Sequence, residues 1–153
     1  MSVDRLLDVT VNTRYPYRYS CGTIASEFFA ALRDEKKILG RKCPACGRVY
    51  IPPRPVCGPC WSPTTEWVEI GPQGVLECFT VVTFTFLDPM TGRTRPVPYG
   101  YGMIRLDGSQ ARFQHFLEES DPGKLRVGLR LEAVFAPERK GSLSDIQHFR
   151  IVE

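Results

Sequence analysis

The chain has 153 residues, of which 42% are hydrophobic, so it is long enough for one ordinary domain or two small ones with a core. Its formal net charge of +3 is too small for the strong basic field that a dedicated nucleic-acid-binding protein carries. No apolar run is long enough to cross a membrane, and the first residues do not resemble a signal peptide. We therefore expect a cytoplasmic protein without membrane contact.

The first 22 residues are predicted to form an extended arm that leads into the one clear helix. Tyrosines and arginines surround Pro16, and two interpretations stay open: the arm lies on the domain's own surface, or it docks on a partner. Residues 23–34 predict a helix with Thr23 as its N-cap and one apolar face, which can pack on the chain's own core or cover a neighbour. The apolar face consists of Ile24, Phe28, Phe29 and Leu32.

Two C-x2-C pairs follow the predicted helix, and ten residues separate them. Each pair can present two thiolates from one tight turn, so together they offer one tetrahedral ion four soft ligands at roughly 2.3 Å. In a reducing compartment this spacing indicates a metal site rather than disulfides; we expect zinc, although iron in a rubredoxin-like site uses the same ligands. Four thiolates leave no position for water or substrate, so the site should be structural. The ligands are Cys43, Cys46, Cys57 and Cys60.

The fold class is predicted to be mainly β, in three successive parts. Residues 1–37 form the arm and helix, residues 38–70 a zinc ribbon, and residues 71–153 a β-barrel. Five predicted strands with a break after the third fit a five-stranded Greek-key barrel of OB type, with a small sandwich as the alternative. In the first of these strands, alternation places Cys78 on the core face. The strands are expected at 76–86, 99–106, 111–117, 129–135 and 146–152, after ribbon strands at 38–42, 48–51 and 67–70.

The order of these parts resembles a known family. A helix, then CPACG, then IPPRPVCGPC, then a barrel entered through GPQGVLECFTVV is similar to the small OB-fold proteins with a rubredoxin-like zinc ribbon that accompany acyl-CoA enzymes. The stretches PYGYGMIRLDG and KLRVGLRLEAVF resemble that family's barrel strands, so the resemblance covers roughly residues 23–153.

This resemblance implies a non-catalytic accessory subunit. Its implied partner is a thiolase-superfamily catalytic subunit, or a hydratase, in a hetero-oligomer such as a heterotetramer. The implied cofactors are structural Zn²⁺ and a CoA thioester that is shared with the partner. A narrower similarity is to the zinc-containing small subunit of the thiolase that cleaves 2-benzoylsuccinyl-CoA in anaerobic toluene breakdown.

A CoA group needs arginine or lysine for its phosphates and an apolar trough for its pantetheine arm. Two groups of residues can reach into a partner's active-site mouth, one in the ribbon and one in and after the predicted loop 88–98. The alternative is that these arginines are solvated on exposed loops. The candidates are Arg48 and Arg54 in the ribbon, and Arg93, Arg95, Tyr99 and Tyr101 in the second group.

Catalysis by the chain alone would need a nucleophile such as a Cys–His pair. Outside the metal ligands, the chain offers Cys21 and Cys78 as thiols, with His115 and His148 as its only histidines. Cys21 lies in the arm, Cys78 is expected in the core, and a barrel wall explains both histidines, so we expect no catalytic residue.

A second function class is a nucleic-acid-binding ribbon and OB domain, since both modules bind nucleic acids in other proteins. Its stacking platforms would be Phe79, Phe113 and Phe116. The weak net charge and the lack of a lysine-rich stripe argue against it, so we do not expect a nucleic-acid partner.

Overall fold

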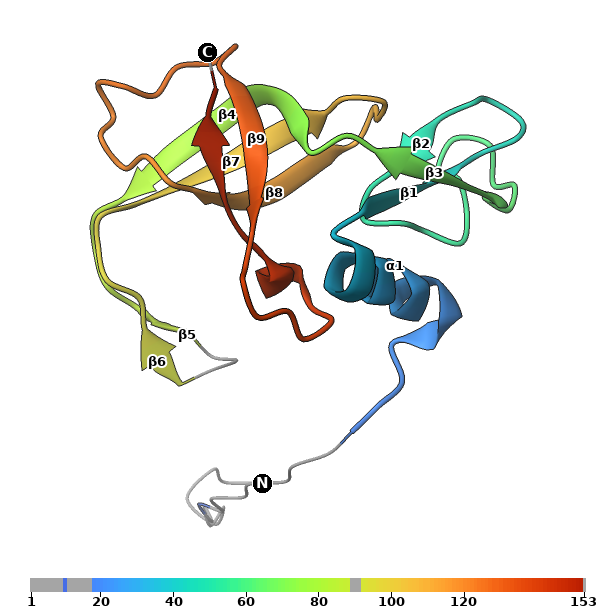
Figure 1. The fold of residues 1–153 in the computed structure, drawn as a ribbon, viewed down its shortest axis with the longest axis horizontal. Helices are drawn as coiled ribbons and strands as arrows, with labels where there is room; N and C mark the ends of the chain where they lie inside the picture. The colour runs from blue at the N-terminus through green and yellow to red at the C-terminus, as the bar shows by residue number, and fades with distance from the viewer. Residues whose placement is uncertain (1–9, 11–17, 89–91, 153) are drawn as a thin grey trace, which may run out of the picture.

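The computed structural model describes Thr10, residues 18–88 and residues 92–152. The predicted arm falls mostly outside these residues, so both interpretations of it stay predictions. In chain order, the described residues form one α-helix, a three-stranded sheet and a closed five-stranded barrel (Figure 1). Sheet and barrel lie at opposite ends of the view in Figure 1, and the helix lies below the sheet. In the described part of the chain, no helix combines the length and apolar character needed to cross a membrane.

Helix α1 (Gly22–Glu35) carries the predicted apolar face and packs it on the chain's own core. Phe28, Ala31 and Leu32 are buried, and Phe28 and Leu32 belong to one cluster with residues of the sheet and barrel. From the segment between residues 135 and 146, the Arg139 Nε–H donates to the Arg33 carbonyl of the helix over 2.7 Å. The helix therefore covers its own chain.

The start of α1 differs from the prediction. The helix begins at Gly22, so Thr23 lies inside it, and Cys21 precedes it without a side-chain cap. The Ser26 hydroxyl donates to the Gly22 carbonyl within the first turn. Thr23 as N-cap was wrong, because Cys21 precedes the helix and Gly22 begins it with a φ of 80°, a conformation that favours glycine.

The three-stranded sheet has the order β2–β1–β3 with antiparallel neighbours. Its strands are β1 (Ile38–Lys42), β2 (Val49–Tyr50) and β3 (Glu66–Ile70). Each lies within one residue of its predicted bounds. The sheet thereby brings the segments that follow β1 and β2, which carry the four clustered cysteines, to one end of the ribbon.

The edge strand β2 is tied to the barrel. The Val49 N–H donates to Gln110 Oε1 over 2.8 Å, and the buried Ser109 hydroxyl donates to the Val49 carbonyl over 3.1 Å. These two bonds occupy the backbone groups that an edge strand otherwise offers to other chains. Ile38 and Ile70 of the ribbon also belong to the same apolar cluster as Leu106 of the barrel. Ribbon and barrel therefore pack as one unit.

Five strands close the barrel in the order β10–β8–β7–β4–β9, as expected for an OB fold. They are β4 (Gln73–Val82), β7 (Tyr99–Leu106), β8 (Arg112–Leu117), β9 (Arg130–Phe135) and β10 (Ile146–Ile151). Closure rests on a short parallel pairing of β8 with β10, in which Leu117 faces Phe149. The predicted barrel is confirmed, and the sandwich alternative is wrong because one sheet closes on itself.

Strand β4 contains an irregularity that strict alternation does not reveal. Its register against β7 shifts between Leu76 and Cys78, so that one extra residue is inserted and the following side chains change face. Leu76 is fully buried as predicted, but Cys78 is exposed, and Phe79 packs against the core instead. The prediction that Cys78 faces the core was therefore wrong.

The first barrel strand also ends earlier than predicted, at Val82. The chain continues into the short hairpin of β5 (Leu87–Asp88) and β6 (Arg93–Thr94), which protrudes from the barrel in Figure 1. Phe84 and Phe86 are 68% and 51% exposed, and their rings lie 6.2 Å apart. Their parity predicted burial, but they lie beyond the barrel wall.

Strand β7 alternates tyrosine and glycine, and this sets which side chains face outward. Gly100 and Gly102 point into the barrel, where a Cβ on Gly102 would lie 2.7 Å from Leu76 Cδ1. Only glycine allows that approach. Tyr99 and Tyr101 therefore lie on the outer face, half-buried.

The loop between β9 and β10 is held by a buried carboxylate. Asp145, at the end of the 3-10 helix η2 (Leu143–Asp145), is 2% exposed. Its Oδ1 accepts the Lys140 N–H and its Oδ2 accepts the Gly141 N–H, each over 2.8 Å. Burial raises the pKa of Asp145, but the backbone donors outweigh it and hold the pKa below its usual value. The loop thereby has a fixed shape beside β8.

We expect Asp145→Asn to destabilise the fold by about 1–3 kcal/mol, because the amide NH₂ must face one of two backbone donors. The native pKa is lowered, so the carboxylate's stabilisation is present above its ordinary pKa of 3.8 and is lost as pH falls through the native value. Urea unfolding should show the largest difference at neutral pH and a shrinking one on acidification. Glu138→Gln removes the same charge at an exposed site and should unfold like wild type; equal losses in both variants would contradict this account.

Candidate functional site

Two turns of the same construction present the predicted metal ligands. The Gly47 N–H donates to the Cys43 carbonyl over 2.8 Å, and the Trp61 N–H donates to the Cys57 carbonyl over 2.9 Å. The residue after each C-x2-C pair has a positive φ, 71° at Gly47 and 55° at Trp61. Glycine favours that conformation, whereas tryptophan adopts it at a cost. The second turn thus holds Trp61 in a strained and 83% exposed position that residue type does not predict.

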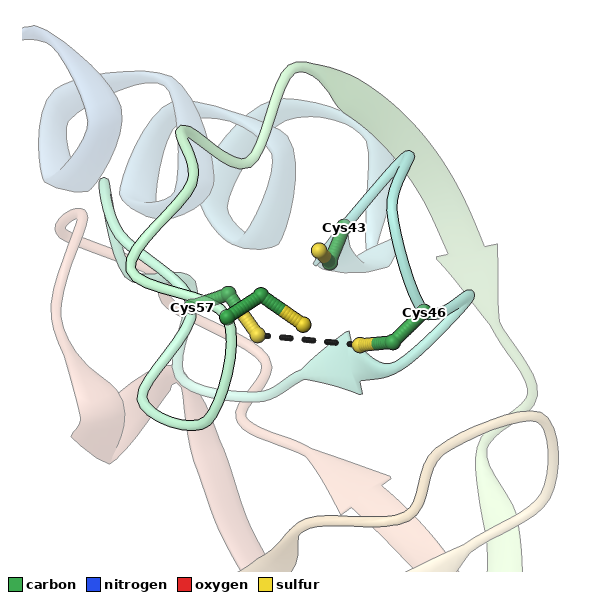
Figure 2. Close-up of side chains that lie close together, drawn as sticks. Cys43, Cys46 and Cys57 are labelled. Atoms are coloured by element: carbon green, nitrogen blue, oxygen red, sulfur yellow. Dashed lines mark hydrogen bonds between the residues drawn. The ribbon is translucent and has the colours of Figure 1, made fainter.

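The four sulfur atoms gather around one point. The Sγ atoms of Cys43, Cys46, Cys57 and Cys60 all lie within 4.8 Å of one another, and Figure 2 shows Cys43, Cys46 and Cys57 directed toward a shared centre. Cys46 and Cys57 Sγ are 3.7 Å apart. Bonds of roughly 2.3 Å to a tetrahedral ion place sulfurs about 3.8 Å apart, whereas a disulfide requires about 2.05 Å. The cysteines are thus positioned for one metal ion, and all are free.

Hydroxyl groups support the two buried sulfurs. Ser62 Oγ lies 3.2 Å from Cys43 Sγ, and Tyr50 Oη lies 3.3 Å from Cys57 Sγ. Because the Gly58 N–H donates to Tyr50 Oη, the tyrosine's own proton is available for the sulfur. The Ser62 hydroxyl lowers the pKa of the Cys43 thiol to about 6, and the Tyr50 hydroxyl lowers the pKa of the Cys57 thiol. Such outer contacts orient and stabilise thiolate ligands.

The neighbouring sulfurs oppose the ionisation of Cys60. Hydrogen bonds with the neighbouring Cys46 and Cys57 sulfurs raise the pKa of Cys60 to about 12. A divalent cation would remove this penalty, because it stabilises every thiolate that it contacts. Four soft sulfurs, two of them supported by hydroxyls, fit a closed zinc site that holds the ribbon together.

The six predicted CoA contacts fall into two separate groups. Arg48 and Arg54 belong to the ribbon, where the Arg54 guanidinium lies 5.9 Å from the centre of the Tyr50 ring. The ribbon lies at the opposite end of the view in Figure 1 from the β5–β6 hairpin, which carries Arg93. The structure therefore does not bring the two groups together.

Three residues of the second group meet around Phe116. The rings of Tyr99 and Tyr101 lie edge-on to Phe116 at 5.7 and 5.2 Å. The Arg95 guanidinium lies 3.7 Å from the Phe116 ring centre and 5.6 Å from that of Tyr99. The fourth residue of this group, Arg93, is exposed in strand β6 of the hairpin.

A cavity of about 400 Å³ opens beside this cluster, between the β7–β8 face and residues 143–147. Arg95 and Tyr101 of its lining were predicted, but sequence reasoning missed the other polar residues, which are Gln114, His115, Ser144 and Gln147. Strand parity could have indicated Gln114 and Phe116 as outward neighbours, but Gln147 joins them only through barrel closure. His115 Nε2 lies 3.2 Å from the Leu143 carbonyl, to which it donates, and burial lowers the pKa of His115.

The three phenylalanines that were predicted as stacking platforms differ in their exposure to solvent. Phe113 is 1% exposed inside the barrel and cannot stack on a ligand, whereas Phe116 faces outward and Phe79 is half-buried. Phe113 and Phe116 differ by three positions, so they lie on opposite faces of β8. The prediction of Phe113 as a platform was wrong.

The spare cysteines and histidines do not form a reactive pair in the part of the chain that the structure describes. Cys21 and Cys78 are exposed, Cys21 next to Ser26 and Cys78 on the barrel. His115 contacts the Leu143 carbonyl, and His148 lies 3.6 Å from a carboxylate oxygen of Glu118.

Two family models match consecutive parts of the chain. The rubredoxin-like zinc ribbon domain of ChsH2 matches residues 30–66, and the C-terminal OB-fold domain of ChsH2 matches residues 67–136. A DUF35 domain-containing scaffold protein from Methanocaldococcus jannaschii is 27% identical over 105 residues, which cover 68% of this chain and 71% of the relative.

Solved structures share the fold. The Ltp2-ChsH2(DUF35) aldolase has a TM-score of 0.63 and 20% identity, with 88% of this chain and 98% of that chain covered. A DUF35 protein of unknown function from Sulfolobus solfataricus has a TM-score of 0.57 and 21% identity, with 85% and 84% covered.

We expect Cys57→Ser to lose zinc, because the change removes one of two buried ligands and metal binding supplies much of a small ribbon's folding free energy. Mass spectrometric metal analysis should find about one ion per wild-type chain and far less in the variant. Amide resonances of the ribbon should lose dispersion in parallel. Cys78→Ser, which changes an exposed sulfur on the barrel, should keep both metal and spectrum; unchanged metal content in Cys57→Ser would refute the assignment.

Proposed function

The chain belongs to the ChsH2 family, and we propose that it is a non-catalytic accessory subunit that docks on the catalytic subunit of an acyl-CoA-processing enzyme. The observation that carries this proposal is the union of a closed four-cysteine ribbon with that family's barrel in one chain. A full shell of thiolates has no position for substrate. The zinc ion therefore stabilises the ribbon, and the chemistry belongs to the partner.

The names of similar proteins support a catalytic partner. The Methanocaldococcus jannaschii relative is described as a scaffold protein, and one structure of the same fold is described as an aldolase that contains a ChsH2 (DUF35) component. For this chain we take the partner to be a thiolase-superfamily subunit in a cytoplasmic hetero-oligomer, with a hydratase as the alternative. The reaction is then a thiolase-type carbon–carbon cleavage, for which 2-benzoylsuccinyl-CoA is the candidate substrate.

Within this complex the cluster around Phe116 helps to shape the CoA channel. Arg95, Tyr99 and Tyr101 combine a cation with aromatic surface beside a cavity. These features suit the phosphates and the planar base of a CoA thioester. Arg48 and Arg54 belong to the ribbon, so the channel proposed here does not include them.

Binding to a nucleic-acid backbone is less consistent with the charges on the barrel. Arg105 and Arg112 both contact Glu77, Arg130 contacts Asp107, and Arg150 contacts Glu132. Arginines that carboxylates already neutralise give little attraction to a track of phosphates.

Purification of the tagged chain from its own host should recover a thiolase-superfamily subunit in fixed proportion, identified by mass spectrometry. Cys57→Ser should lose that partner, because its ribbon no longer presents a folded surface, whereas Cys78→Ser should retain it. Turnover of a thioester by the isolated chain, or wild-type partner recovery with Cys57→Ser, would contradict the proposal.

In the purified complex, replacing both Arg93 and Arg95 by Ala should raise the apparent KM for acyl-CoA by about tenfold or more, because a charge-assisted contact contributes roughly 1.5–3 kcal/mol. Arg126→Ala removes an exposed charge outside the cluster and should leave KM unchanged. Steady-state kinetics at several salt concentrations separates a local contact from general attraction. If no kinetic constant changed in the double variant, these arginines would not line the channel.

A further inference from the structure

We propose that the cavity between the β7–β8 face and residues 143–147 binds the nucleotide end of the CoA thioester, with the purine stacked on Phe116 and a phosphate paired with Arg95. This inference rests on the proposed function and extends it, because it assigns one part of the ligand to this chain. The pantetheine arm and acyl group are then left to the catalytic partner.

The charge of the cavity favours an anion. No Asp or Glu is among its described lining residues, and Arg95 forms no ion pair with any residue that the structure describes. The arginines further along the same outer face, Arg105 and Arg112, are both neutralised by Glu77 at 2.6 Å. Among the described residues, Arg95 is therefore a cation with aromatic contacts but no anionic partner, and a phosphate group would supply one.

The aromatic surface favours a planar ring. Tyr99 and Tyr101 meet Phe116 edge-on, at interplanar angles of 68° and 70°, and hold its ring in a fixed orientation. The flat Arg95 guanidinium now occupies the stacking position above that ring, 3.7 Å from its centre. The planar ring of a ligand that also carries a phosphate can take the guanidinium's place above Phe116, and the guanidinium can then pair with the phosphate. Stacking on an aromatic side chain contributes roughly 1–3 kcal/mol per base.

The location of the cavity in the fold also agrees with the proposed ligand. OB folds bind oligonucleotides and oligosaccharides on the face of their second and third strands and at the adjoining loops, which here are β7 and β8 with residues 92–98 and 136–145. The amides of Gln114 and Gln147 offer donors and acceptors to the edge of a heterocycle. Of the parts of a CoA thioester, only the 3′-phosphorylated adenosine diphosphate combines a heterocycle with phosphates.

Isothermal titration of the zinc-loaded full-length chain with adenosine 3′,5′-bisphosphate tests the proposal. Saturable binding is expected, and Phe116→Leu should weaken it by roughly 5- to 100-fold through lost stacking. Arg95→Gln should weaken it by about tenfold or more through the lost charge-assisted contact. Arg126→Gln makes the same charge change at an exposed site and should bind like wild type. Metal content and thermal unfolding of each variant confirm that it is folded.

Several results would overturn the inference. These are no binding of the bisphosphate, equal weakening by Arg126→Gln, competition by pantetheine or by an aromatic carboxylate, and tighter binding of a single-stranded oligonucleotide. Partner recovery separates this inference from the proposed function. A negative titration with the partner still recovered removes only the nucleotide assignment, whereas failure to recover the partner removes the accessory role itself.

Discussion

One apolar core, shared by all three parts of the chain, holds the molecule together. Phe28 of the helix, Ile38 of the ribbon and Ile104 of the barrel are each at most 1% exposed and belong to the same hydrophobic cluster. Burial of one such side chain contributes roughly 1.5–3 kcal/mol, and a ribbon of three short strands has few of them. Two of the metal-site cysteines, Cys43 and Cys57, lie in a separate small cluster with Tyr50. The ribbon is thus stabilised by apolar contacts at the end near the barrel and by metal coordination at the end away from it.

Features that depend on neighbours in sequence were predictable. Hydrophobic spacing located the helix, and the C-x2-C spacing identified the four ligands that the structure brings within 4.8 Å. Features that depend on pairing with a distant strand were not. The bulge after Leu76 is an accommodation to β7, so alternation alone assigned Cys78 to the wrong face. The end of β4 at Val82 is likewise set by where the barrel closes, since Phe84 continues the same parity beyond it.

The lining of the cavity likewise combines residues that are close in sequence with residues that only strand pairing brings together. Arg95, Tyr99 and Tyr101 are close in sequence, and their association could be anticipated from that. Phe116 joins them because it is the register partner of Tyr101, and Gln147 joins because β10 closes against β8. The glycines of β7 make the arrangement possible, because they leave the interior to Leu76 and Leu117 while the tyrosines occupy the outer wall.

The pair of hydrogen bonds between Val49 and residues 109–110 has a consequence for how this protein can be altered by recombination. A ribbon exchanged between relatives by a crossover near residue 70 would arrive without the barrel loop that satisfies its edge strand. Ribbon and barrel are therefore expected to be inherited as one module. Changes of partner would then arise by point substitution at protruding positions such as Trp61, whose indole contributes little to the chain's own packing.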